Sequence, residues 1–66
     1  MKVTVNGAPR DVPDDVTVRG LIDCLGLSEG PVAVEVNRAI VPRALHAEHR
    51  VRSGDEIEIV HFVGGG

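Results

Sequence analysis

One short segment of this chain has the hydrophobic period of a helix, whereas its other apolar segments have the period of strands. The apolar residues of that segment recur at positions i, i+3, i+4 and i+7, and they are Val18, Leu21, Ile22 and Leu25. At about 100° per residue these side chains form one stripe. Residues 1–5 and 56–59 instead alternate between apolar and polar side chains, as half-buried strands do. A short helix stabilised by one apolar stripe must pack on a sheet, so the pattern predicts an α+β domain.

Turn and capping residues divide the first half of the chain. Asn6-Gly7 readily adopts the positive φ angles of a type I′ hairpin turn, so we expect residues 10–12 to return as a second strand beside the first. Thr17 is suited to cap the start of the helix, and Gly26 is suited to the left-handed position after its end.

The second half of the chain reads as three further strands. Residues 32–36 and 39–41 flank a possible turn at Asn37-Arg38, and residues 56–63 form the last strand after a Ser-Gly-Asp turn. Between them, residues 43–49 suit one loose helical turn. This order of elements describes a β-grasp, with a mixed four- to five-stranded sheet on one main helix, although periodicity does not give the strand order.

The chain has 66 residues, which is enough for one small domain; we place it at residues 1–63, followed by a flexible glycine tail at 64–66. Such a domain has little room for a catalytic cleft beside its core, so we do not expect an autonomous enzyme. The net charge of −3 and the lack of Trp and Tyr argue against nucleic acid as a partner. With no long apolar run, a single cysteine and no secretory leader pattern, we expect no membrane contact and a cytoplasmic location.

Cys24, His46 and His49 are the residues to weigh as nucleophiles or metal ligands. A catalytic nucleophile needs a base and a group that orients the base, and the sequence shows no clear set of this kind. We interpret Cys24, on the flank of the apolar stripe, as a semi-buried small hydrophobic residue. The i, i+3 spacing of the two histidines is too small a ligand set for zinc, so we expect solvated surface side chains and no metal site.

Arginines recur between residues 38 and 52, at Arg38, Arg43, Arg50 and Arg52. Two interpretations stay open for them. They can form a solvated face with local ion pairs, or a basic contact surface for a partner or a phosphate group.

Three glycines, Gly64, Gly65 and Gly66, end the sequence and suit neither a helix, a strand nor a core. They are either a frayed end or a side-chain-free tail, in which Gly64 and Gly65 let the backbone thread a narrow slot in another protein. Gly66 would then present its carboxylate, which needs activation, for example by attachment of a nucleotide phosphate. Because the sequence has no glycine-rich phosphate loop before a helix, we expect no bound cofactor, and ATP would be held by a partner.

Residues 34–43 and 54–60 resemble the thiamine-biosynthesis sulfur carriers of the ThiS family, in the ubiquitin-like β-grasp group. The first segment reads VEVNRAIVPR and contains the family's Val-Asn turn and Val-Pro-Arg signature; the second reads GDEIEIV and leads to the glycine tail. The resemblance extends over essentially residues 1–66. It implies the strand order of a ubiquitin-like β-grasp.

The resemblance also implies a carrier that is a co-substrate of partner enzymes. An E1-like adenylyltransferase would use ATP to convert the Gly66 carboxylate into an acyl-adenylate. Sulfur from a cysteine desulfurase or another donor would then produce a thiocarboxylate, with thiazole synthase as the recipient. Alternatives are a carrier like the small subunit of molybdopterin synthase, a non-covalent binding module like the TGS β-grasp domains, and an enzyme that uses Cys24 or the histidines.

The last strand offers a docking surface beside the tail. If Ile57 and Ile59 are core residues, alternation places Val60 and Phe62 on the opposite face, where they would form a small apolar patch for a partner. The alternative is a bulge near His61 that reverses the register and buries Phe62.

Overall fold

A computed structural model of the chain describes residues 1–27 and 30–62. Its elements, in chain order, are β1 (Lys2–Val5), β2 (Ala8–Asp11), α1 (Val18–Cys24), β3 (Val32–Val36), β4 (Ala39–Val41), the 3-10 turn η1 (Arg43–Leu45) and β5 (Glu56–His61). No helix in these two ranges is long and apolar enough to cross a membrane. The predicted order of strands and helix is confirmed, and the second strand begins two residues earlier than expected.

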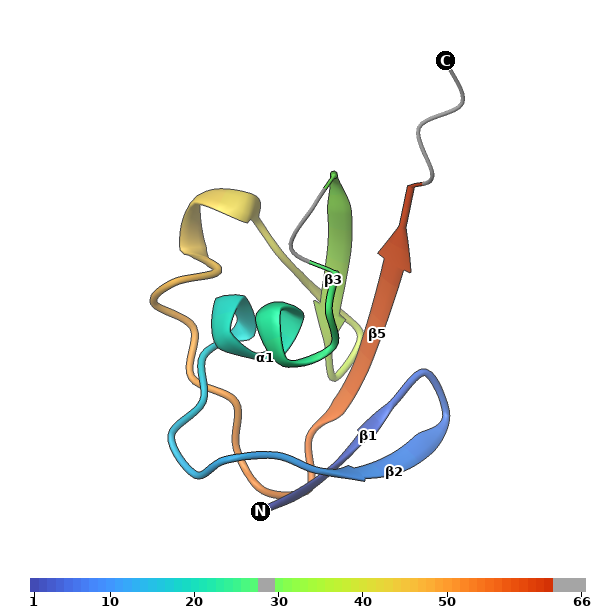
Figure 1. Cartoon of the computed structure of the whole chain (residues 1–66), viewed down its shortest axis with the longest axis vertical. Coiled ribbons are helices and arrows are strands. Elements are labelled where there is room, and N and C mark those ends of the chain that lie inside the picture. Colours follow the sequence, from blue (N-terminus) through green and yellow to red (C-terminus); the bar gives the residue numbers. More distant parts are fainter. Residues whose placement is uncertain (28–29, 63–66) are drawn as a thin grey trace.

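The strands form one mixed sheet in the order β2-β1-β5-β3-β4 (Figure 1). β5 lies in the middle, parallel to β1 and antiparallel to β3, and the two hairpins β1–β2 and β3–β4 occupy the outer positions. The parallel contact between the first and last strands requires the chain to cross the sheet, and α1 lies within this crossover. The predicted mixed sheet of four to five strands on one main helix is therefore confirmed, and it has five strands.

The core lies between α1 and one face of the sheet. Val18 and Leu21 of α1 and Ile57 of β5 are each 0% exposed, and Ile22 and Ile59 are also buried. The predicted apolar stripe and the predicted inward face of β5 are therefore confirmed. The helix ends at Cys24, before the last member of the stripe, and the partly buried Leu25 packs against the core as the C-cap residue.

Tight turns and one side-chain cap set the boundaries of these elements. Asn6 and Gly7 have φ angles of 51° and 82°, as the predicted type I′ turn requires, and Asn37 and Arg38 adopt 51° and 71° in the β3–β4 turn. The Oγ1 atom of Thr17 accepts a hydrogen bond of 3.1 Å from the Gly20 backbone N–H, which confirms the predicted cap.

Candidate functional site

β5 carries the chain across the middle of the sheet to Phe62, the last residue that the structure describes (Figure 1). Its pairing with β3 runs without a break from Ile57 opposite Val36 to His61 opposite Val32. Beyond β5, the Phe62 N–H still donates to the Pro31 carbonyl oxygen at 3.1 Å. The base of the C-terminal segment is thus held firmly against β3. The predicted tail residues Gly64, Gly65 and Gly66, and the end of the predicted domain at residue 63, lie outside the described residues.

The side of β5 that faces β1 is held by a side chain as well as by backbone. Where β1 turns away, the Asn6 Oδ1 atom accepts from the Ile59 N–H at 2.8 Å, and its Nδ2 group donates to the Ile59 carbonyl at 3.2 Å. Asn37 has a similar place at the start of β5, where its Oδ1 atom accepts from the Glu56 N–H at 3.0 Å. The sequence indicates both asparagines only as turn residues, and no local pattern signals this second role.

Val60 and Phe62 project large apolar surfaces to solvent, with 55% and 52% of each residue exposed. The uninterrupted pairing of β5 with β3 shows that the predicted alternation holds, so the alternative of a bulge near His61 is not realised. Ile40 on β4 is 75% exposed. Ile40 pairs with Glu35 of β3, and Val60 pairs with Ala33 of the same strand. Because residues 33 and 35 lie on one face of β3, Ile40 and Val60 lie on the same face of the sheet. We call Ile40, Val60 and Phe62 the sheet patch.

Ile40 was not among the predicted docking residues, although the alternation within residues 39–41 indicates that it faces outward. Val41 is buried, so its neighbour in the strand must face outward.

Acidic side chains lie beside the sheet patch. Glu35 and Glu58 are directly opposite each other on β3 and β5, and Glu56 lies on the same face of β5. Like charges in this position destabilise a sheet by a few tenths of a kcal/mol or more, about as much as a favourable pair stabilises it. A partner with basic side chains around an apolar centre would complement this face and relieve the repulsion.

The structure corrects two expectations about reactive side chains. His46 is 6% exposed and not solvated, because the turn after η1 folds it inward, where its Nε2 atom lies 2.9 Å from the Val41 carbonyl oxygen. Cys24 is exposed and not semi-buried, because it lies at the end of α1 on the helix flank. Within residues 1–27 and 30–62, no group of three or more His, Cys, Asp or Glu side chains is placed to hold a metal ion.

The four arginines of residues 38–52 do not form one surface. Arg50 pairs with Asp15 at 3.6 Å, whereas Arg38 is part of the β3–β4 turn. Arg43 instead lines a pocket together with Arg19, which lies far from it in the sequence. Arg50 and Arg52 line a second pocket together with His49. Local ion pairing is thus observed for Arg50, and the basic contact surface stays a prediction.

Comparisons with known proteins agree with this geometry. The family model of the ThiS family matches residues 3–66. The crystal structure of a thiamine biosynthesis protein (ThiS) from Geobacter metallireducens superposes with a TM-score of 0.84 at 33% identity, with all of both chains covered. This confirms the ubiquitin-like β-grasp fold that the resemblance implied.

Two kinds of sequence relative match the whole chain. The sulfur carrier protein ThiS of Escherichia coli is 30% identical over 66 residues, with all of both sequences covered. A thiazole synthase of Paramagnetospirillum magneticum is 44% identical over 66 residues, and the chain spans 20% of its length. The family match over almost the entire sequence, together with the shared fold, shows that this chain belongs to the ThiS family.

Proposed function

We propose that this chain is a sulfur carrier for the formation of the thiazole of thiamine. The observation that supports this most directly is its full-length match to a family whose Escherichia coli relative is named a sulfur carrier protein. The structure fits this function, because β5 leads from the middle of the sheet directly toward the glycine tail. The sheet fixes the chain as far as Phe62, and the proposed reaction takes place on Gly66 at the end of the tail.

The chemical step takes place on the Gly66 carboxylate. One of its oxygens attacks the α-phosphorus of ATP and pyrophosphate leaves, which produces an acyl-adenylate. A sulfur nucleophile then attacks the acyl carbon and AMP leaves, so that a carbon–sulfur bond replaces a carbon–oxygen bond. An E1-like adenylyltransferase binds the ATP. A sulfide donor gives the thiocarboxylate directly, whereas a persulfide from a cysteine desulfurase gives an acyl-disulfide, which a further thiol cleaves to release the thiocarboxylate and to form a disulfide with the donor sulfur. The carrier is therefore a co-substrate, and Gly64 and Gly65 let the tail enter narrow active sites.

Thiazole synthase is the proposed recipient of the sulfur. Regions similar to the whole of this chain occur within proteins named thiazole synthase from Paramagnetospirillum magneticum and Magnetococcus marinus, at 44% and 41% identity. The chain spans about a fifth of the length of each. A carrier region within a synthase is consistent with direct transfer between the two.

The sheet patch is the proposed docking surface for these partners. Val60 and Phe62 lie at the end of β5, so a partner that covers them also has access to the tail. Exposed aromatic side chains are typical anchors of such interfaces.

Sulfur loading in solution tests this function. The chain is incubated with the activating enzyme, ATP and a sulfide source, and its intact mass is measured. The mass should rise by the difference between sulfur and oxygen, and omission of ATP should prevent the rise. A variant without Gly65 and Gly66 is the matched control; sulfur loading of that variant would show that the tail is not the site.

A further inference from the structure

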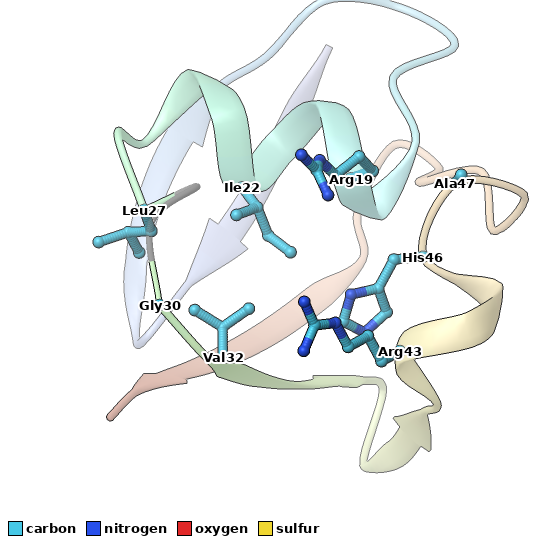
Figure 2. A pocket seen from close by; sticks show the side chains of 8 residues that line it. All are labelled: Arg19, Ile22, Leu27, Gly30, Val32, Arg43, His46 and Ala47. Atoms are coloured by element: carbon cyan, nitrogen blue, oxygen red, sulfur yellow. The ribbon is translucent and has the colours of Figure 1, made fainter. Parts of the chain in front are cut away.

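A pocket of about 130 Å³ lies on the helix side of the sheet, between α1, the start of β3 and the segment that contains η1 (Figure 2). Arg19 comes from α1, and Arg43 and His46 come from η1 and the residue after it. Figure 2 shows both arginine side chains extending toward the same space, beside Ile22 and Val32. The pocket lies on the face of the sheet opposite to the sheet patch, because Val32 alternates with the outward-facing Ala33.

Arg19 and Arg43 give the pocket a positive charge. Two guanidinium groups line one small space in a molecule whose net charge is −3. Arg19 has a single ion-pair contact, from its Nε atom to Asp23 at 3.4 Å, and both side chains of that pair are more than half exposed. Arg43 has no ion pair within residues 1–27 and 30–62. Among the described residues, the terminal nitrogens of both arginines thus have no ion-pair partner, and guanidinium groups of this kind bind anions well.

The rest of the lining is apolar. Ile22, Leu27, Val32 and Ala47 form this part of the pocket. An inorganic phosphate ion has no apolar atoms, so the oxygens that face these residues would stay hydrated and the apolar lining would not contribute to its binding. A carboxylate on a short aliphatic stem would match both parts, because its methylene groups can cover Ile22 and Val32 while its oxygens reach the arginines.

The backbone holds the two arginines in a fixed relation. The Arg19 N–H donates to the His46 carbonyl oxygen at 2.9 Å, and the His46 N–H donates to the Arg43 carbonyl oxygen at 3.1 Å. The His46 ring, which is bonded to the Val41 carbonyl, anchors the same turn to β4. The backbone that carries both arginines is thus held in place without a ligand, which lowers the part of the binding entropy that comes from ordering the backbone.

The pocket is close to the base of the tail. Val32, which lines it, pairs with His61 of β5, and Pro31 accepts the hydrogen bond from the Phe62 N–H. A partner that takes up the tail passes this end of the sheet, and to enter the pocket it must also reach around from the face that carries the sheet patch. We propose that the pocket binds a glutamate side chain of the docking partner, as a second contact that fixes the orientation of the carrier. The assignment of this glutamate to a docking partner rests on the proposed carrier function, whereas the binding of a carboxylate in the pocket does not.

The ligand chemistry is tested without sulfur, ATP or partner. The full chain, labelled with nitrogen-15, is titrated with N-acetylglutamate α-amide, and amide shifts are followed by NMR. Shifts should concentrate at Ile22, Gly30, Val32 and Ala47 and should weaken as salt is added. The N-acetylglutamine analogue, which keeps the stem but lacks the charge, should cause no such shifts. Arg43→Gln should raise the dissociation constant about fivefold or more, because it removes a charge-assisted hydrogen bond.

Arg38→Gln is the matched control, since it removes the same charge at the opposite end of β3 and should leave binding unchanged. Tighter binding of inorganic phosphate than of the glutamate probe, equal binding of the glutamine analogue, or no effect of Arg43→Gln would overturn the assigned ligand chemistry. If Arg43→Gln does not fold, Arg43→Lys is titrated instead. Lysine keeps the positive charge but lacks the two guanidinium nitrogens that can bind one carboxylate, so its binding of the glutamate probe should also be weaker.

Binding of the carrier to the activating enzyme and to thiazole synthase tests the occupant. Calorimetry should show that Arg43→Gln weakens binding to at least one of them about fivefold, while Arg38→Gln does not. Unchanged affinity for both partners would overturn the assignment of the occupant, even if sulfur loading proceeds. Failure of sulfur loading with a positive titration would instead reject the carrier function and leave the pocket chemistry standing.

Discussion

The side chain of Asn6 forms two hydrogen bonds with the backbone of Ile59, a residue that is 53 positions away in the sequence. Asn6 is also the first residue of the β1–β2 turn, with a φ angle of 51°. One side chain thus joins the first turn of the chain to the strand that leads to the tail. Beyond the paired residues of β1, it continues the hydrogen bonding on that side of β5.

Asn6→Gly should therefore destabilise the domain. Glycine adopts positive φ freely, so this change removes both hydrogen bonds without straining the turn. We expect a loss of about 1 to 3 kcal/mol in the free energy of unfolding, measured by urea denaturation. Amide exchange at Ile59 should also become faster. An unchanged unfolding midpoint would show that the two bonds add nothing to the stability of β5.

Arg38→Gly introduces glycine at the second position of the β3–β4 turn, and the opposite sign is expected. Arg38 has a φ angle of 71°, which is unfavourable for a residue with a Cβ atom. Glycine relieves this strain but adds freedom to the unfolded chain, so the net gain should be at most about 1 kcal/mol. Thermal melts of both variants side by side measure the difference. A destabilisation as large as that of Asn6→Gly would mean that glycine itself, and not the lost hydrogen bonds, causes both effects.

Phe62→Ala tests the sheet patch. Because half of Phe62 is exposed, the truncation should leave the melting temperature of the monomer nearly unchanged. The affinity for the activating enzyme, measured by calorimetry, should fall by about 1 to 3 kcal/mol, as for a typical aromatic anchor. Ile57→Ala provides the contrast, since it removes a fully buried side chain and should cost about 2 to 5 kcal/mol of folding stability. Unchanged affinity of Phe62→Ala would place the docking surface elsewhere.

Cys24→Ala should preserve sulfur loading. The thiol is exposed at the end of α1, and the proposed chemistry takes place on the tail. Stability should change by less than about 0.5 kcal/mol, as for most surface substitutions. Loss of loading in a variant with an unchanged melting temperature would instead implicate the thiol.

Local patterns predicted most of the elements, because each depends on residues close together in the sequence. The stripe from Val18 to Ile22, the Thr17 cap and the inward face of Ile57 and Ile59 were all readable in this way. The strand order was not, since periodicity carries no information on which strands pair, and it came from the family resemblance.

The features that sequence analysis missed depend on tertiary structure. The burial of His46 depends on how the turn after η1 folds against β4, and the bonds of Asn6 depend on the approach of β5. The pocket that joins Arg19 and Arg43 depends on the packing of α1 beside η1. Each of these contacts joins residues from different elements of the fold, so their spacing in the sequence does not predict the contact.

We propose that Gly66 carries the sulfur. The most direct test of this proposal is intact-mass measurement, with fragmentation, of the protein purified from its own cells grown without thiamine. We expect a form that is heavier by the replacement of one oxygen by sulfur, with the added mass confined to the C-terminal fragment that contains Gly66. Sulfur located on Cys24, or no sulfur-bearing form in cells that are making thiamine, would contradict it.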